Sequence, residues 1–571
     1  DERYFKSKIK LMSFLKIDNL SVNYTMRKET VYAVKNINLE VKKGEILGLV
    51  GESGSGKSTL GNAIINLIDE PGKISNGSVI LDGINIHAKP QDILKFRGKK
   101  IGLIFQDPQT SLNPLLTIGE QLIETIQTHL ELSLEESKTR AIDLLKEVGI
   151  KDADKRFDNY PHQFSGGMRQ RVVISLALCC EPELLIADEP TTALDVSIQS
   201  QILELIKTLT KERNLAVILI THDMGVISET ADRVAVMKNG DLVEIGITKE
   251  ILTNPKATYT KNLISSVPPT NKKILRFKTM EKEKNNQEGV NIKILDRWNK
   301  KEITSQDLIS VKNLKKTFQD GMFTEASKNT VLAVDDVSFD IKEGDSFGLV
   351  GESGSGKSTI AKMVVNLFKP SSGEIFFDNV CITKIKKNKE MMKFRKQIQM
   401  IFQDPYSSLN GRLKVRDIIA EPIKLHNPLI SNKDLDNYIN DLLESVELSQ
   451  KSAIRYPHEF SGGQRQRISI ARALATQPRL LVCDEPTSAL DVSIQAQILN
   501  LLKDLQEQLN LTILFISHDL PVIRQMCDRI GVLRNGKLCE VSSTEELFLN
   551  PKHEYSKKLL HLMPKIESIY N

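Results

Sequence analysis

The sequence predicts an α/β protein in which one kind of domain occurs twice in tandem. The first observation is an internal repeat, because GLVGESGSGKST occupies residues 48–59 and again residues 348–359. The second is a series of short apolar runs that do not alternate with polar residues, as expected of strands covered on both faces of a sheet. These runs are EILGLV at 45–50, LLIAD at 184–188 and AVILIT at 216–221. With 571 residues, the chain is long enough for two such domains.

The repeat continues well beyond the glycine-rich motif. IFQDP recurs at 104 and 401, YPHxFSGGxRQR at 160 and 456, DEPTxALDVSIQ at 188 and 484, and a His-Asp pair at 222 and 518. From FSGG to His-Asp the copies show no net insertion, which favours two paralogous domains over a solenoid. We predict an N-terminal extension over 1–15, a first domain with its C-terminal tail over 16–268, a charged linker over 269–306 and a second domain over 307–571.

Composition excludes several classes of protein. No apolar stretch reaches the 18 or more residues that a spanning helix needs, and no secretion or lipidation signal opens the sequence, so we expect a soluble chain. Six cysteines without a CxxC motif fit a reducing compartment. The net charge of +5 equals the excess of ten Lys or Arg over five acids in residues 271–302, so no nucleic-acid partner is expected. We interpret this charged segment as a solvated tether, onto which Trp298 could add a docking contact.

The GESGSGKST segments predict a loop that binds phosphate. Both fit G-x-x-x-x-G-K-[ST] between an apolar strand and a helix, which we predict over 57–68 in the first copy. Backbone N–H groups and the start of the helix favour an anion there, the lysine would hold β/γ oxygens and the following serine would bind Mg²⁺. The residues predicted to bind ATP here are Gly51, Ser53, Gly54, Ser55, Gly56, Lys57, Ser58 and Thr59, with Gly351, Ser353, Gly354, Ser355, Gly356, Lys357, Ser358 and Thr359.

Acidic residues and a histidine follow two later strands in each copy. An Asp at the end of an apolar strand can reach Mg²⁺ directly or through water, and the Glu after it is placed to polarise the water that attacks the γ-phosphate. The His after the next strand could hold water and phosphate in line. A lone His is more often a core residue, but its repetition in both copies favours function. These residues are Asp188 and Asp484, Glu189 and Glu485, and His222 and His518.

Together these motifs resemble the ATP-binding cassette (ABC) ATPases over both repeats. FSGGM at 164–168 and FSGGQ at 460–464 are similar to the signature sequence of that family, Gln106 and Gln403 to its Q-loop, and TALD at 192–195 and SALD at 488–491 to its D-loop. The resemblance implies two P-loop NTPase domains, each a RecA-like core with an antiparallel β part and a helical subdomain. Residues 114–150 and 411–447, which we predict to be helical, would form that subdomain.

By this resemblance, the two domains sandwich two ATP molecules head to tail. Lys57, Ser58, Asp188, Glu189 and His222 would face Ser461 and Gly463, while their counterparts in the second copy would face Ser165 and Gly167. The resemblance adds as ATP-binding residues Gln106, Ser165, Gly166, Gly167, Gln403, Ser461, Gly462, Gly463 and Gln464. The Mg²⁺ ligands it implies are Ser58, Gln106, Asp188, Ser358, Gln403 and Asp484.

Two further details of the sites follow from the family pattern. Adenine usually stacks on an aromatic residue upstream of the phosphate loop, and we choose Tyr24 and Phe318, with Tyr32 as a competitor of Tyr24. Met168 departs from the commoner Gln of the signature. Because both copies keep the Glu and the His, we still predict two hydrolysing sites.

A finer resemblance connects the chain with the ATPases of bacterial peptide and nickel importers. The segments that carry it are IFQDPQTSLNP, YPHQFSGGMRQRV, DEPTTALDV and the tails NPKATYTKNLISSVP at 254–268 and PKHEYSKKLLHLMP at 551–564. The implied function is ATP hydrolysis that energises uptake of a dipeptide, an oligopeptide, a glutathione-like peptide or a nickel chelate. The implied partners are two transmembrane permease subunits near the Q-loops and an extracytoplasmic substrate-binding protein, with the chain peripheral at the cytoplasmic face of the inner membrane.

The sequence also bears on an iron–sulfur cluster and on an alternative function. Many members of that subfamily carry an iron–sulfur cluster, but no Cys occurs between 180 and 381 or after 539, so none is predicted. The alternative function is that of a soluble tandem-cassette ATPase acting on the ribosome, whose long basic inter-domain arm this shorter segment of mixed charge does not match. DNA-repair cassettes and exporters fit less well, because the chain has neither zinc-binding cysteine clusters nor fused membrane helices.

Overall fold

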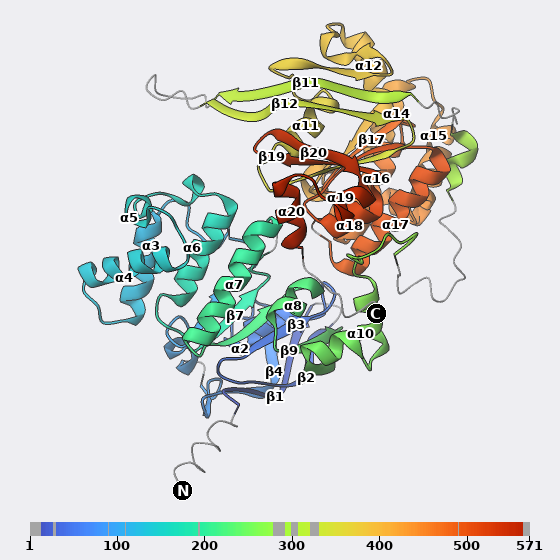
Figure 1. Cartoon of the computed structure of the whole chain (residues 1–571). Coiled ribbons are helices and arrows are strands. Elements are labelled where there is room, and N and C mark those ends of the chain that lie inside the picture. Colours follow the sequence, from blue (N-terminus) through green and yellow to red (C-terminus); the bar gives the residue numbers. More distant parts are fainter. Residues whose placement is uncertain are drawn as a thin grey trace. The chain divides into compact units, whose positions relative to one another are not determined.

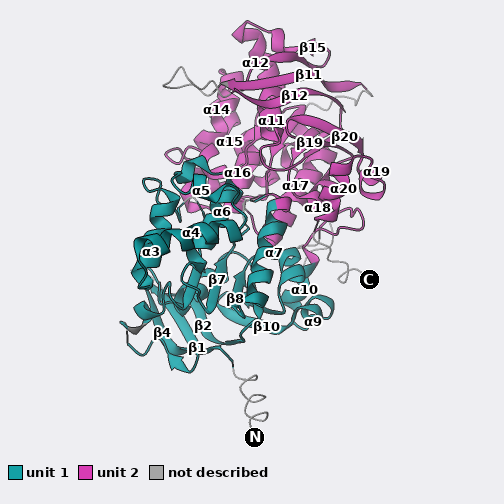
Figure 2. Cartoon of the chain, turned by 60° about the vertical axis from the view of Figure 1, so that its left-hand side comes forward, with its two compact units in different colours: residues 1–194, 198–264, 564–571 teal, residues 195–197, 265–563 magenta. Residues whose placement is uncertain are grey.

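The computed structural model describes residues 13–26, 30–89, 91–108, 110–191, 194–277, 292–298, 306–319, 330–488 and 490–563. The chain folds into two compact units (Figure 2). Unit 1 comprises residues 1–194, 198–264 and 564–571, and unit 2 comprises residues 195–197 and 265–563. The tandem α/β organisation expected from the repeat is confirmed.

Unit 1 contains two sheets. The first is four-stranded and antiparallel, in the order β2-β1-β4-β5, with β1 Leu15–Thr25, β2 Thr30–Val41, β4 Gly72–Leu81 and β5 Ile84–Asn85. The second is six-stranded, in the order β10-β9-β3-β8-β7-β6, with β3 Ile46–Val50, β6 Ile101–Ile104, β7 Leu184–Asp188, β8 Ala216–Ile220, β9 Arg233–Lys238 and β10 Asp241–Ile247. Its strands are parallel except for β10. The carboxyl ends of β3, β7 and β8 therefore meet at one edge, where α/β proteins bind ligands.

Several helices of unit 1 lie together beside its sheets. In Figure 1, α3, α4, α5 and α6 gather to one side of the strands. Of these, α3 and α4 lie within residues 114–150, where the helical part was expected, and α6 begins at the FSGG motif. The bounds are α2 Lys57–Ile64, α3 Ile118–His129, α4 Leu134–Glu147, α5 Ala153–Arg156, α6 Gly166–Leu178, α7 Val196–Glu212, α8 Met224–Thr230, α9 Thr248–Thr253 and α10 Thr258–Ser265, with short 3₁₀ turns η1 Asp92–Lys95 and η2 Pro161–Gln163.

Local sequence accounts for these helix boundaries. Thr117 caps α3, since its hydroxyl accepts from the backbone N–H of Glu120, and the Glu120 carboxylate accepts from the N–H of Thr117 at 2.7 Å. The helix predicted over 57–68 ends earlier, at Ile64, because Asn66 adopts a left-handed φ of 54° that stops the helix. Leu60 and Ile64 of α2 are buried in a core that also includes residues of both sheets. This packing fixes the start of α2, and with it the loop before it.

Unit 2 repeats this architecture. Its sheets have the orders β12-β11-β14-β15 and β16-β17-β18-β13-β19-β20. The strands are β11 Asp307–Gln319, β12 Thr330–Lys342, β13 Ser346–Val350, β14 Ser372–Phe377, β15 Val380–Cys381, β16 Ile398–Ile401, β17 Leu480–Asp484, β18 Thr512–Ile516, β19 Arg529–Arg534 and β20 Lys537–Ser543. The α-helices are α11 Lys357–Val364, α12 Asn388–Gln397, α13 Pro405–Ser408, α14 Val415–His426, α15 Asn432–Ser445, α16 Gly462–Leu474, α17 Val492–Leu509, α18 Leu520–Met526, α19 Thr544–Leu549 and α20 Glu554–His561, and the 3₁₀ turns are η3 Lys293–Arg297, η4 Ile382–Lys384, η5 Gln450–Ile454 and η6 Pro457–Glu459.

The charged segment between the repeats is not a solvated tether where the structure describes it. We call residues 269–277 and 292–298 the strap. The side chains of Phe277, Ile294 and Trp298 belong to the hydrophobic core of unit 2. Trp298 is only 9% exposed, so it docks this segment onto unit 2. The backbone of Phe277 exchanges two hydrogen bonds of 2.9 Å with the amide of Asn500. The free energy gained by burying these apolar side chains on unit 2 outweighs the solvation of the charged residues in the strap. The domain boundaries at 268 and 306 stay predictions.

Candidate nucleotide sites

The two glycine-rich loops join a central strand to a helix and pass very close to neighbouring backbone. In unit 1 the loop connects β3 to α2, and Gly56 has a φ of 98°, which side-chain-bearing residues rarely adopt. A Cβ at Gly56 would overlap the carbonyl oxygen of Ala33, and one at Gly356 would overlap that of Ala333. Glycine at these positions therefore lets the loop curl at the start of the helix, where backbone N–H groups can face an anion.

Each loop lysine folds back onto its own loop. Lys57 Nζ donates to the carbonyl oxygens of Gly51 at 2.7 Å and Glu52 at 2.9 Å, and Lys357 makes the same two bonds to Gly351 and Glu352 at the same distances. Both lysines are buried, and burial lowers the pKa of Lys357. The ammonium group thus lies at the loop where a phosphate would bind, already donating to oxygen atoms of the kind that phosphate offers.

The strand-end aspartates offer oxygen ligands beside the loops. Ser358 Oγ donates to Asp484 Oδ1 at 2.9 Å, so the two predicted Mg²⁺ ligands of unit 2 are in contact. In unit 1, Asp188 Oδ1 is buried without a hydrogen-bond partner. Burial raises the pKa of both aspartates. A buried carboxylate oxygen beside a hydroxyl is the hard-oxygen donor set that Mg²⁺ takes together with phosphates, so these residues fit the ion.

Metal binding by protein side chains alone is a separate question. Within the described ranges, no group of three or more His, Cys, Asp or Glu side chains is arranged to hold a metal ion. The prediction that the chain lacks an iron–sulfur cluster stays a prediction.

The glutamate after each aspartate is held at both of its oxygens. Glu189 Oε1 lies 2.9 Å from His222 Nδ1, and its Oε2 accepts from Gln106 Nε2 at 2.7 Å. Glu485 has the same partners, with 3.2 Å to His518 Nδ1 and 2.8 Å to Gln403 Nε2. The structure thus brings together the Glu and His that the sequence nominated in each copy. Gln106 and Gln403, predicted as Mg²⁺ ligands, contact the glutamates.

Backbone geometry and charge show how tightly the glutamates are constrained. Glu189 and Glu485 have φ values of 48° and 47°, a left-handed conformation that non-glycine residues seldom adopt. Burial lowers the pKa of His222 and His518, but the hydrogen bond to the glutamate and its charge raise the pKa by more, so the net shift is upward. Burial alone would raise the pKa of Glu485. The hydrogen bond to His518 and the charge of that residue lower this pKa by more, so the net shift is downward. The pair is therefore stabilised as imidazolium and carboxylate.

The FSGG motifs form the starts of two helices. Ser165 and Ser461 are the N-caps of α6 and α16, and their hydroxyls accept from the N–H of Met168 and Gln464, both at 3.4 Å. In unit 2 the Gln464 Oε1 also accepts from the N–H of Ser461 at 3.1 Å, which a methionine cannot do. Met168 thus removes one cap bond from the first signature helix. How Ser461 or Ser165 meets the loop of the other unit stays a prediction.

The residues chosen for adenine lie on the first strand of each repeat. Tyr24, on β1, is partly buried against the core, whereas its competitor Tyr32, on β2, is 54% exposed. Phe318, on β11, is 37% exposed and meets Phe368 edge-on, with 5.7 Å between the ring centroids. An exposed ring face suits stacking. The adenine assignments stay predictions.

Sequence reasoning missed a tyrosine that contacts each phosphate loop. The hydroxyl oxygen of Tyr259, on α10, accepts from the backbone N–H of Glu52 at 3.2 Å, and that of Tyr555, on α20, accepts from the N–H of Glu352 at 3.2 Å. The available signal was the repeated spacing NPKxxY in the two tails. Nothing in the loop sequence indicates that its backbone needs an acceptor.

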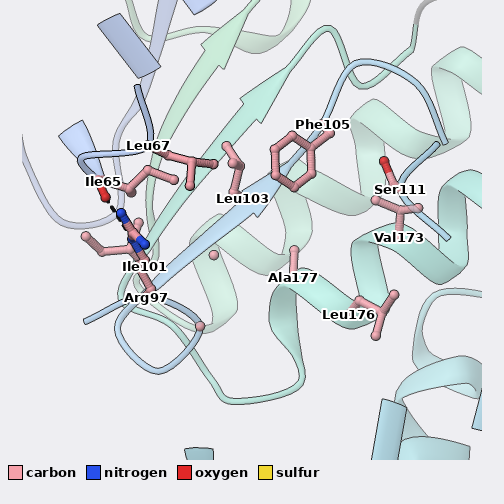
Figure 3. Close-up of a pocket in the computed structure, with 12 residues that line it drawn as sticks. Ile65, Leu67, Arg97, Ile101, Leu103, Phe105, Ser111, Val173, Leu176 and Ala177 are labelled. Atoms are coloured by element: carbon pink, nitrogen blue, oxygen red, sulfur yellow. Dashed lines mark hydrogen bonds between the residues drawn. The ribbon is translucent and has the colours of Figure 1, made fainter. Parts of the chain in front are cut away.

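A hollow of about 270 Å³ opens beside the Gln motif of unit 1. Figure 3 shows Phe105 and Leu103 from one side and Val173, Leu176 and Ala177 of α6 from the other. Phe105 is 45% exposed and directly precedes Gln106. The walls are therefore mainly apolar, and one of them is adjacent in sequence to a residue that contacts Glu189.

Comparison with known proteins identifies the family. The family model described as ABC transporter matches residues 34–192 and 334–488, and the one described as oligopeptide/dipeptide transporter, C-terminal region, matches residues 243–292. The glutathione import ATP-binding proteins GsiA of Shigella dysenteriae serotype 1 and of Escherichia coli strain K12 are each 42% identical over 97% of this chain and 90% of the relative. A dimeric post-hydrolysis structure of the ATP-binding cassette MJ0796 with ADP and Pi is 34% identical over 41% of this chain and 98% of that one, with a TM-score of 0.38.

The chain belongs to the ABC transporter family. It is an importer ATPase with both nucleotide-binding cassettes in one polypeptide. The matches support this function and not the ribosomal alternative. No helix in the described part of the chain is long and apolar enough to cross a bilayer.

Proposed function

We propose that each cassette binds Mg²⁺ and ATP at its glycine-rich loop and hydrolyses the ATP with its Glu–His pair. The observation that carries the proposal is the carboxylate of Glu189 or Glu485, oriented by His and Gln at the end of the strand beside the loop. Such a carboxylate suits a general base that polarises water near the γ-phosphate. Because both copies keep the full set, we assign activity to both.

The remaining residues would position the phosphates. Lys57 and Lys357 would donate to β/γ oxygens, and Ser58 with Asp188, or Ser358 with Asp484, would hold Mg²⁺. When bound, Mg²⁺ supplies charge neutralisation on the phosphates. Since Nδ1 of His222 engages Glu189, its Nε2 is the atom with which it would contact phosphate or water. Each signature segment, Ser165 to Gly167 in the first cassette and Ser461 to Gln464 in the second, would contact the ATP bound at the loop of the other cassette.

We infer that two permease subunits dock near Gln106 and Gln403. The apolar hollow beside Phe105 supports this in unit 1, because its rim is one residue from Gln106, whose amide contacts the general base. A segment that fills the hollow would therefore act on the catalytic carboxylate through two neighbouring residues. ATP can shift such a coupled equilibrium only by its preference for one state, and hydrolysis removes that preference.

The transported solute is proposed as a small peptide, and the relatives named for glutathione import favour a glutathione-like one. The proposed location is the cytoplasmic face of the inner membrane, with a substrate-binding protein on the far side. Uptake of labelled glutathione and of a dipeptide by cells that express the chain with candidate permeases would separate these solutes.

The decisive experiment is ATP turnover of the purified chain and of Glu189→Gln, Glu485→Gln and the double variant. We expect each single variant to lose much of the turnover and the double variant to lose nearly all of it, with ATP still bound. Asp158→Asn, an acidic loop residue outside both sites, is the matched control. Full turnover in the double variant would refute the assignment.

Permease docking is tested with Leu176→Asp, which places a charge in the hollow. We expect the stimulation of turnover by permease-containing membranes to fall well below that of the wild type. Stimulation equal to the wild type would exclude this hollow as the docking site, without affecting the assignment of the ATPase residues.

A further inference from the structure

We infer that Tyr259 and Tyr555 are positioning residues for the two phosphate loops. Each lies in the C-terminal tail of its cassette, and each hydroxyl orients the first peptide group of the loop, which in turn sets where the loop lysine rests. The inference rests on the proposed assignment of these loops as the ATP sites.

The contacts in unit 1 converge on a single peptide group. Its N–H, from Glu52, donates to the Tyr259 hydroxyl at 3.2 Å, and its carbonyl, from Gly51, accepts from Lys57 Nζ at 2.7 Å. The peptide is planar, and in the trans form its N–H and C=O point in opposite directions. The hydroxyl and the ammonium group therefore hold the two ends of one rigid plane. Rotation of that plane would break both bonds together.

Unit 2 repeats the arrangement. Glu352 N–H donates to the Tyr555 hydroxyl at 3.2 Å, and Lys357 Nζ donates to Gly351 at 2.7 Å. Two copies that differ at many other positions have thus kept the same three-residue contact. A buried tyrosine hydroxyl needs a partner in any protein, but here the partner is the same loop peptide in both cassettes.

The tail holds each tyrosine ring in place independently of the hydroxyl. The Tyr259 ring is buried, with Lys238 Nζ 4.6 Å from its centroid. The Glu244 carboxylate accepts from the N–H groups of Lys256 at 2.8 Å and Ala257 at 3.1 Å, which fixes the chain just before α10. Tyr555 is likewise buried, with Arg534 4.9 Å from its centroid. Removing the oxygen alone should therefore leave the ring where it is.

The consequence concerns nucleotide affinity. Without the hydroxyl, the Glu52 N–H loses its acceptor, and the peptide plane is free to turn away from Lys57. The lysine would then no longer be held beside the phosphate position before ATP arrives, and binding would have to restore the order of the loop. In unit 1, α10 lies within the stretch 243–292 that the second family model matches, and through Tyr259 it thereby acts on the nucleotide loop of its own cassette.

The test is a titration of the full chain with ADP and with a non-hydrolysable ATP analogue, using Tyr259→Phe, Tyr555→Phe and the double variant. The control is Tyr438→Phe, a substitution on α15, which carries no residue of either loop. It removes a buried hydroxyl that donates to the carbonyl oxygen of Ala475 at 3.4 Å. We expect the double variant to raise Kd about fivefold, the factor for one lost hydrogen bond. KM for ATP should rise more than kcat falls, and Tyr438→Phe should leave Kd unchanged.

A background with one site disabled makes the test sharper. In Lys357→Ala, only the first loop should retain tight binding, so Tyr259→Phe must weaken the remaining site and Tyr555→Phe must not. If the double tyrosine variant lowers the unfolding temperature as Tyr438→Phe does but binds nucleotide as the wild type does, the tyrosines are merely structural and the inference is wrong. If Lys57→Ala with Lys357→Ala binds nucleotide as the wild type does, the loop assignment itself fails.

Discussion

The Oε1 atom of Glu189 lies 2.9 Å from Nδ1 of His222, and the corresponding distance between Glu485 and His518 is 3.2 Å. In both cassettes this contact joins a residue after one parallel strand to a residue after the next. The imidazole thereby restrains the carboxylate that we assign as general base. The Gln on its other oxygen completes the restraint.

This relationship predicts that His222→Ala lowers kcat more than it weakens ATP binding. Measured in a Glu485→Gln background, where only the first site turns over, we expect a loss of about a hundredfold, the lower range for a positioned acid–base group. Steady-state turnover and a separate binding titration distinguish the two parameters. An unchanged kcat would show that the histidine takes no part in the reaction and is only a core residue.

The missing cap bond at the first signature helix predicts that Met168→Gln stabilises α6. The new side chain can accept from the N–H of Ser165 as Gln464 does from Ser461, a gain of about 0.5–1 kcal/mol in the free energy of unfolding. Gln464→Met should show the opposite change. Hydrogen exchange at the amide of residue 165 reports this bond directly. If that amide exchanges at the wild-type rate in Met168→Gln, the cap has not formed.

The strap supplies a prediction about stability. Arg276 bridges Asp504, whose side chain is 2% exposed, at 2.8 Å and Glu507 at 2.6 Å. Arg276→Ala would remove the ion pair of a buried carboxylate and should cost about 3 kcal/mol. The control is Lys273→Ala, whose more exposed pair with Asp528 should contribute no more than about 1 kcal/mol. Urea unfolding can be followed by the fluorescence of Trp298, the only tryptophan. Equal midpoints for the two variants would contradict the prediction.

A pH dependence follows from a buried lysine under the strap. Burial lowers the pKa of Lys503 from 10.5 to about 8, and its Nζ donates to the carbonyl oxygens of Ile274 and Leu275. Between pH 8 and 10.5 the unfolded chain binds this proton while the folded chain does not. The stability of the wild type relative to Lys503→Met should therefore rise with pH in that window, by up to about 1.4 kcal/mol per unit. Unfolding midpoints of both proteins from pH 7 to 10 test this, and a constant difference would show that Lys503 keeps its ordinary pKa.

Sequence motifs predicted those features for which the chemistry demands particular residue types. The loop glycines follow β3, Asp188 ends β7, and Glu189 and His222 follow β7 and β8, as the motifs indicated. The reason is that anion binding and close backbone approach admit few residue types, so that the pattern is specific. The contact between Glu189 and His222 is a finding of the structure.

The sequence did not predict features that depend on backbone groups or on scattered apolar residues. Tyr259 contacts the N–H of Glu52, and a backbone N–H is present whatever the side chain. In the strap, Phe277 and Trp298 are separated by many charged residues, so composition indicated solvation although burial of these few side chains decides the structure. Gln106 could be assigned to a metal from the family pattern, but only the geometry reveals its bond to Glu189.

The strap also determines where the gene could be divided into two cistrons. A cut near residue 306, where the sequence suggests the second repeat begins, would leave residues 269–277 and 292–298 on the wrong polypeptide and expose the core surface that Phe277 and Trp298 cover. A cut just after Ile264 would give the second polypeptide its own strap. Residues 269–277 and 292–298 are thus an N-terminal extension that belongs to the second half of the chain.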